Sequence, residues 1–448
     1  MQVLCIQVIH LSYYKIIIFV LLSLIAGVLS AEGKNSSALP DPLTLEFALS
    51  LSGNDHPDSI VARSRLQDAQ ASRDIIDGNN GLQTRLEGRL RWVEPSDQVL
   101  DPDREDHSIV LSASKRLYDF GRSSADSAAA EASVNSRNWL LTDQQTQHRI
   151  AIMQAFFDVI LADLAYARDN ELMAIKYVRF DRAQDRNKLG QIADVDLLEA
   201  ENAYYQSRSI RYASDVSRRA SRSKLANILN FPGELPANLV RPELLVLSRE
   251  LPDIDELQKE VLKTNLGLLA LRQQVESAQQ RVLSARARKK PTIDLELQAA
   301  GYSRKFRSSD KYRGGFVFEM PLSSSGALDA AIAQQRSQLL EARARLRKAE
   351  MDVQQQVLES WQLLTVGKAR RDEAAVFSEY RDAALDKDRG LYELDVAADL
   401  GDSLALYSAA LYQSAKADYD YALVWARLDA LLGKQVGLVE TNNGVVKK

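Results

Sequence analysis

The stretch that decides the fold reads KRLYDFGRSS, residues 115–124. Before it, apolar and polar residues alternate, as they do in a β-strand with one apolar face. After Gly121 there is no glycine or proline until Gly190, which predicts one uninterrupted helix. At a rise of about 1.5 Å per residue, a helix from Arg122 to Leu189 is roughly 100 Å long, whereas the apolar core of a bilayer is about 30 Å thick. A strand therefore meets a helix that is far longer than any membrane is thick.

Four segments of about ten residues show the same alternation of apolar and polar side chains. In the first of them, Leu86 and Trp92 occupy one face and Arg85 and Glu87 the other. A tilted strand of this length crosses a bilayer, but about eight strands are needed to close a barrel. Because open sheet edges are not tolerated in lipid, several chains would have to share one barrel. The alternative is a pair of ordinary surface hairpins. The four segments are residues 81–93, 108–118, 291–302 and 313–322.

The chain has two halves with the same order of predicted elements: a helix, two strands, a very long helix, a turn and another long helix. The first repeat covers residues 32–232 and the second covers residues 254–433. This indicates an internal duplication, because the period is too long for a solenoid. Residues 233–253 contain three prolines and are predicted to be a linker. Residues 434–448 form a C-terminal tail.

Residues 1–31 have the pattern of a signal peptide. Lys15 precedes an apolar run of about fourteen residues that ends in small residues, too short for a spanning helix of about twenty. An uncleaved anchor is the alternative. Cys5 lies upstream of that run, so the mature chain would have no thiol for a disulfide or a metal site. We expect no membrane-spanning helix further along the chain, so a membrane location would require a β-barrel.

The composition excludes several classes of function. With 57 basic and 61 acidic residues, the chain has no overall basic footprint for nucleic acid. Residues 112–115 and 221–224 match the hydrolase string S-x-x-K, but no K-T-G partner accompanies them. Past the signal segment, His56, His107 and His148 are far apart in sequence. We therefore expect no enzyme activity, no cofactor and no metal site.

The order of strand, LYDFGR and long helix, with AFFDVILA (155–162) and KLGQIADVDLLEAENAYYQSR (188–208), resembles the TolC-like outer membrane factor family. The resemblance extends from about Leu43 to Gly433. It implies a mixed α and β membrane protein with two structural repeats. Its fold would be a trimeric β-barrel, with four strands per chain, continued by a long periplasmic α-helical barrel.

The resemblance also implies a location and a function. The protein would lie in the outer membrane of a Gram-negative bacterium, in contact with outer-membrane lipid, with a periplasmic domain. It would be the passive exit duct of a tripartite efflux or type I secretion system, gated at its periplasmic end. Its partners would be two further copies of itself, a periplasmic adaptor (membrane fusion) protein and an inner-membrane transporter. A soluble periplasmic coiled-coil scaffold is the alternative.

Particular residues match positions to which the family assigns roles. Gly121 resembles the turn from barrel to tunnel, where glycine supplies backbone freedom. Gly326 is its counterpart in PLSSSG (321–326), where serines replace the aromatic residue and the aspartate. The turns between long helices, at Gly190 and Gln191 and at Asp395, would dock the adaptor.

The gate would lie at the same turns. Asp196 matches the aspartate that follows the first turn in the family, and Asp399 and Asp402 resemble aspartates that constrict the pore. Tyr392 lies just before them in the second turn. The alternative is that these carboxylates cap helix starts, where the helix dipole favours negative charge.

Overall fold

The structure is a computed structural model that describes residues 39–53, 56–95, 103–234, 236–304, 310–394 and 400–436. The chain divides into two compact units, Met1–Pro40 and Asp41–Lys448, and the second contains the elements given below. The expected signal peptide, Asp395, Asp399 and residues 437–448 of the expected tail lie outside the described residues.

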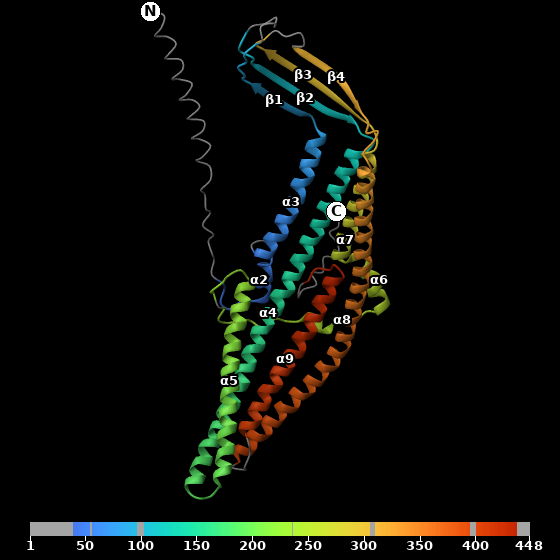
Figure 1. Cartoon of the computed structure of the whole chain (residues 1–448). Coiled ribbons are helices and arrows are strands. Elements are labelled where there is room, and N and C mark those ends of the chain that lie inside the picture. Colours follow the sequence, from blue (N-terminus) through green and yellow to red (C-terminus); the bar gives the residue numbers. More distant parts are fainter. Residues whose placement is uncertain are drawn as a thin grey trace, which may run out of the picture. The chain divides into compact units, whose positions relative to one another are not determined.

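The second unit combines long helices with one small sheet (Figure 1). Two helices, α4 and α8, are each 67 residues long and each follows a strand directly. The elements in chain order are α2 (Leu45–Ser50), α3 (Pro57–Asn80), β1 (Gln83–Arg89), β2 (Ser108–Tyr118), α4 (Arg122–Lys188), α5 (Asp194–Ile228), the 3₁₀ helix η1 (Leu245–Ser248), α6 (Ile254–Thr264), α7 (Leu266–Ala287), β3 (Thr292–Tyr302), β4 (Tyr312–Glu319), α8 (Ala327–Glu393) and α9 (Leu400–Leu431).

The four strands form one antiparallel sheet in the order β1-β2-β3-β4. Its register confirms the predicted alternation. One row across the sheet is polar and consists of Arg85, Ser112, Gln298 and Arg313. The next row points to the other face and consists of Leu86, Leu111, Ala299 and Tyr312. The apolar face is exposed, with Leu86 at 66% and Phe316 at 74% of full exposure. In Figure 1 the sheet extends beyond the ends of the long helices.

The long helices form a layer in which α4 is central, since it contacts α3, α5, α7 and α9. Near the sheet the neighbours are α3, α4, α7 and α8 in that order, and further away they are α5, α4, α9 and α8. Helix α4 therefore packs against α3 and α5 as well as against α7 and α9, which explains its wide apolar face. Ile152, Phe156 and Phe157 are buried, and the ring of Phe157 stacks on that of Tyr419 in α9 with 4.4 Å between centroids.

One described helix, α4, contains a window that is long and apolar enough to cross a membrane, and 44% of that window is buried. We expected no stretch of this length and apolar composition after the signal segment, and that expectation is wrong. The physical reason lies in the packing, because α4 contacts α3, α5, α7 and α9 along its length. Its apolar side chains serve contacts between helices.

A second core joins α6, α8 and α9. Trp425 of α9 is fully buried there, together with Val357 and Leu364 of α8 and Leu257 and Val261 of α6. These side chains fasten the edge helix α8 to the rest of the layer.

Two helices, instead of the single one expected, precede each pair of strands: α2 and α3 precede β1, and α6 and α7 precede β3. The break between α6 and α7 lies at Asn265, whose Oδ1 accepts a hydrogen bond from the Leu268 N–H at 3.0 Å and caps α7. Its Nδ2 donates to the carbonyl oxygen of Leu431 at 2.9 Å. Asp253 caps α6 in the same way, since its Oδ1 accepts from the Asp255 N–H at 2.8 Å. Asp and Asn are favoured caps, so this break has a signal in the sequence.

Candidate functional site: the two ends of the long helices

Both strand-to-helix junctions use two consecutive residues in the left-handed region. Gly121 has φ 86° and is preceded by Phe120 at φ 54°. Gly326 has φ 83° and is preceded by Ser325 at φ 48°. The two glycines therefore occupy the junctions at which the sequence analysis placed them, and the second junction has the same backbone without the LYDFG sequence.

The side chain that caps the helix also has a counterpart at the second junction. Asp119 is buried, and its Oδ2 accepts hydrogen bonds from the N–H of Ser123, at 2.8 Å, and from the Ser123 hydroxyl. Ser324 lies at the matching place before α8, and its Oγ accepts from the Leu328 N–H at 3.4 Å. The serines of PLSSSG thus preserve the cap although they remove the carboxylate.

At the opposite end, Gly190 and Gln191 form the exposed turn between α4 and α5. Gly190 has φ 69°, and its N–H donates to the carbonyl of Asn187 at 2.8 Å. The N–H of Gln191 donates to the carbonyl of Arg186 at 2.9 Å. These bonds satisfy the last carbonyls of α4 and fix the direction in which the chain reverses.

Asp196 lies in the first turn of α5, and its Oδ2 accepts a hydrogen bond from the N–H of Ala193 at 3.2 Å. Beside it, Asp194 accepts from the side-chain amide of Asn187 at 2.9 Å, which joins the end of α4 to the start of α5. Asp196 therefore serves as a helix cap in this structure, while its side chain is also exposed to solvent.

The start of α9 lies against α4. Asp402 lies in the first turn of α9, and its Oδ2 is 2.7 Å from Nη2 of Arg179 in α4. The side chains of Arg179 and Asp402 are 39% and 42% exposed. Gly401 lets the helices approach closely, because a Cβ there would lie 3.1 Å from Cγ1 of Ile175. The ion pair and the close approach together tie the start of α9 to the last third of α4.

The other predicted gate residue, Tyr392, lies in the last turn of α8 with 63% of its surface exposed. The structure therefore brings Asp402 together with Arg179, a residue that the sequence analysis did not single out. Arg179 carries no local signal, because its partner is 223 residues away in the chain.

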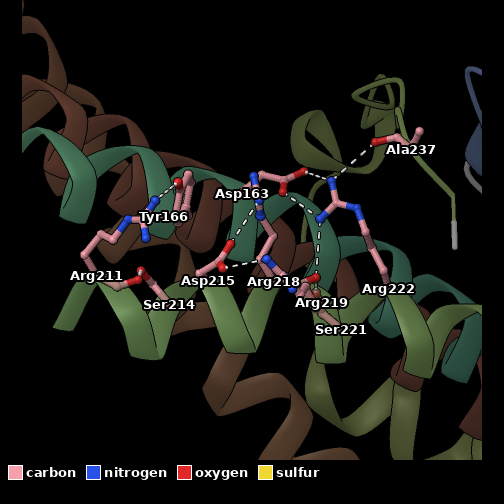
Figure 2. Close-up of polar contacts among 10 residues, drawn as sticks. All are labelled: Asp163, Tyr166, Arg211, Ser214, Asp215, Arg218, Arg219, Ser221, Arg222 and Ala237. Carbon is pink, nitrogen blue, oxygen red and sulfur yellow. Dashed lines mark hydrogen bonds and ion pairs between the residues drawn. The ribbon is translucent and has the colours of Figure 1, made fainter. Parts of the chain in front are cut away.

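Arginine side chains hold the connecting segment between α5 and α6, residues 229–253, against the helices (Figure 2). The two terminal nitrogens of Arg222 in α5 each lie 2.8 Å from a carboxylate oxygen of Asp163 in α4. Nε of Arg222 donates to the carbonyl of Pro236 at 3.1 Å, and Nη2 donates to that of Ala237 at 3.4 Å. One guanidinium thus joins α4, α5 and the connecting segment.

A related arrangement lies on the other side of the layer. Arg371 of α8 is 2.7 Å from Asp418 of α9 through Nε, and its Nη1 donates to the carbonyl of Leu247 at 3.1 Å. Nη1 of Arg249 in the connecting segment donates to both carboxylate oxygens of Asp429 in α9, at 2.9 and 2.8 Å. The connecting segment is therefore held at both of its ends by arginine.

A histidine pair lies beside the middle of α4. His148 is buried, and the centroid of its ring is 4.3 Å from that of His56, the residue before α3. Burial lowers the pKa of His148, as does the electrostatic effect of the neighbouring His56, while the carboxylate of Asp58 opposes them. Burial also raises the pKa of Asp143, one turn earlier in α4. No group of three or more His, Cys, Asp or Glu suited to a metal ion occurs among the described residues.

No protein-family model matches this chain. Over 271 residues the chain is 25% identical to the outer membrane efflux protein BepC of Brucella suis biovar 1. The matched region is 58% of this chain and 57% of BepC, so the chain spans a little over half the length of this curated relative.

Solved structures match far more of the chain. The CmeC outer membrane channel of Campylobacter jejuni matches with a TM-score of 0.72 and 12% identity over 92% of each chain. VceC, an outer membrane protein of Vibrio cholerae, matches with a TM-score of 0.68 and 15% identity over 88% of this chain and 97% of VceC. CusC matches with a TM-score of 0.71 and 16% identity over 87% of this chain and 92% of CusC.

The chain therefore has the fold of outer membrane channels that combine a strand region with long helices. The resemblance to TolC-like outer membrane factors that the sequence indicates is confirmed at the level of the fold.

Proposed function

We propose that this protein is an outer-membrane channel that serves as the exit duct of a tripartite efflux system. The observation that carries the proposal is the four-stranded sheet, which has one exposed apolar face, one polar face and two unpaired edges. A soluble scaffold would leave that apolar face in water, whereas lipid covers it and a water-filled lumen suits the opposite face. BepC is named as an outer membrane efflux protein, which supports efflux as the task. Conduction through such a duct is passive and involves no enzymatic step.

The sheet edges require partners, and we assign them to further copies of the chain, as a homotrimer. In one copy, β1 and β4 are the unpaired edges, and the matching edges of the helical layer are α3 with α5 on one side and α8 on the other. Both helical edges expose large apolar side chains. These include Tyr212 and Val216 of α5 and Val376 and Tyr380 of α8.

The two exposed patches lie at a similar level along the helices. Three contacts between neighbouring helices show that Tyr212 and Val376 lie at a similar height along the layer. In order from α5 to α8, these contacts are Arg211 with Tyr166, Arg168 with Tyr412, and Asp418 with Arg371. The α5 edge of one copy can therefore meet the α8 edge of the next.

The test is a pair of cysteines, Tyr212→Cys with Val376→Cys, in the full chain expressed in a Gram-negative host. Within one copy the two positions lie on opposite edges of the helical layer, so oxidation should join different copies and produce covalent trimers in the outer-membrane fraction. Each single variant is the control and should give no covalent trimer. A soluble, uncross-linked double variant would contradict the proposal.

Several finer assignments belong to this proposal. The chain consists of two repeats, residues 32–232 and 254–433, joined by the linker 233–253, and the equal lengths of α4 and α8 support that division. Residues 1–31 are the signal peptide and residues 434–448 the tail.

The exposed turn at Gly190 and Gln191 is the docking point for a periplasmic adaptor, together with Asp395, which lies outside the described residues. The adaptor in turn connects the duct to an inner-membrane transporter. A type I secretion system would use the same duct, and its transporter would then belong to a secretion pathway.

We place the gate at the end of the helices that lies away from the sheet. Asp196, Asp402 and Tyr392 lie there, on the first turns of α5 and α9 and the last turn of α8. We assign Asp399, which lies outside the described residues, to the same gate. The ion pair between Arg179 and Asp402 supports this assignment, because it ties the start of α9 to α4 and must be released before the two helices can separate.

A further inference from the structure

Four basic residues lie at or near the end of the sheet that adjoins the helices. Arg286 lies in the last turn of α7, Arg288 caps that helix, and Lys290 precedes β3. Lys115 lies near the end of the neighbouring strand β2. All four are exposed, and we call them the cationic collar.

The collar borders the apolar face of the sheet. Lys115 pairs with Leu295, which in turn pairs with Phe316, so these three side chains share one face. The register then shifts between Arg116 and Tyr118, with the result that Tyr118 pairs with Ile293 on that same apolar face. Bulges of this kind re-aim side chains at the rim of a sheet.

Aromatic rings connect the sheet face to the collar. The rings of Tyr118 and Phe120 meet edge to face with 4.7 Å between centroids. Nζ of Lys290 lies 5.6 Å from the centroid of the Phe120 ring. Aromatic residues beside cations are typical of the level at which lipid headgroups lie.

The carboxylates around the collar are already engaged by other groups. Asp294 accepts from Arg116 at 3.0 Å, and Asp329 is paired with Lys289. The carboxylate of Asp119 accepts a hydrogen bond from the N–H of Ser123. In the part of the chain that the structure describes, no carboxylate lies within ion-pairing distance of Lys115, Arg286, Arg288 or Lys290. The dipole of α7 favours cations at Arg286 and Arg288, but it does not account for Lys115 and Lys290.

We propose that the cationic collar binds the phosphates of anionic phospholipids in the membrane leaflet nearest the helices, while the apolar sheet face takes their acyl chains. The inference rests on the proposed function, since it requires the sheet to lie in a bilayer. Basic residues at a membrane surface each strengthen the binding of anionic lipid, by a factor of about five per residue. Long lysine and arginine side chains can reach the headgroups while their stems stay on apolar surface.

The experiment uses the full chain, purified in a neutral detergent and titrated with dioleoylphosphatidylglycerol or with dioleoylphosphatidylcholine. Native mass spectrometry reports how many lipids each oligomer retains and with what affinity. The wild type should retain phosphatidylglycerol in preference, and this preference should weaken as salt rises. The fourfold variant Lys115→Gln, Arg286→Gln, Arg288→Gln and Lys290→Gln should lose at least tenfold in affinity for phosphatidylglycerol and little for phosphatidylcholine.

A matched control removes the same number of charges from exposed basic residues farther along the helices. It combines Arg65→Gln, Arg137→Gln, Arg343→Gln and Lys348→Gln. This control should keep the wild-type lipid preference. If the fourfold collar variant kept that preference too, or if inorganic phosphate at millimolar concentration displaced the lipid completely, the collar would not be a lipid site. Failure of the wild type to retain either lipid would instead contradict the proposed membrane location.

Discussion

At the scale of single residues, backbone conformation explains the junction glycines better than any contact does. Gly121 has φ 86°, and an added Cβ would meet no atom within 4 Å. Gly121→Ala should therefore lower the free energy of unfolding by about 1–2 kcal/mol, because a residue with a Cβ is strained in the left-handed conformation. Gly390 is the control, because it lies inside α8 with equally open surroundings, and Gly390→Ala should stabilise by up to about 1 kcal/mol. Denaturant titration measures both, and equal effects would contradict this explanation.

His148 predicts a dependence of stability on pH. Burial and the neighbouring His56 lower its pKa below the ordinary value of 6.5, so the unfolded chain binds a proton at a higher pH than the folded chain does. Stability should therefore be fully present above pH 6.5 and should fall as the pH decreases toward the folded pKa. Thermal unfolding between pH 8 and pH 5.5 measures the slope, which should become smaller in His148→Asn. His107→Asn leaves the pair of His56 and His148 intact and is the control, so the slope that His148 causes should persist in it.

At the scale of elements, the local sequence pattern was sufficient to predict most of the helices and strands. The alternation predicted β2 over residues 108–118, and the absence of glycine and proline predicted α4 to within one residue of its observed end. Strand β1 is shorter than the predicted segment 81–93, although Trp92 still pairs with Glu105 in an isolated bridge. The break at Asn265 was missed because its cap depends on one side chain inside an otherwise helical sequence.

The central position of β3 gives a prediction for the sheet. Leu295 lies in a strand that pairs with β2 on one side and β4 on the other. Proline has no backbone N–H, so at this position it removes a hydrogen-bond donor from a strand that is paired on both sides. Leu295→Pro should prevent formation of a detergent-resistant oligomer and its insertion into the outer membrane. Leu295→Val keeps the β-propensity and should assemble normally. An oligomer of Leu295→Pro that resists detergent would show that the strand is not a membrane strand.

The connecting segment gives a second prediction at this scale. Arg222 is 16% exposed and serves Asp163 and two backbone carbonyls, so Arg222→Gln should loosen the segment by about 1–3 kcal/mol. Subtilisin should then cleave between residues 232 and 244 several-fold faster than in the wild type. Arg219 is the matched control, because it is 74% exposed and its pair with Asp215 contributes about 0–1 kcal/mol. Equal cleavage rates for the two variants would exclude a fastening role for Arg222.

At the scale of the whole molecule, the sequence predicted the fold and proposed Asp402 as a gate residue, but it did not predict the contact that Asp402 makes. Asp402 was predicted from the resemblance, whereas Arg179 was not, because the pair joins residues that only the packing of α9 against α4 brings together. The same limit applies to Arg222 and Asp163, which are 59 residues apart. Helix caps and apolar periodicity can be recognised in a short stretch of sequence. An ion pair between residues far apart in the chain leaves no such pattern.

The pair of Arg179 and Asp402 leads to the prediction about gating. If it holds the start of α9 against α4, then Arg179→Ala and Asp402→Ala should each raise the mean single-channel conductance in planar bilayers, because the ends of the helices separate more often. Each side chain is about two-fifths exposed, so the pair is weak enough to break in normal function. The charge exchange Arg179→Asp with Asp402→Arg should return the conductance toward the wild-type value, since it restores the attraction. Lys188→Ala with Asp185→Ala removes an exposed ion pair within α4 and is the control, which should leave conductance unchanged. If the exchange left the conductance as high as in the single variants, the two residues would act separately, and the proposed gate would not depend on their contact.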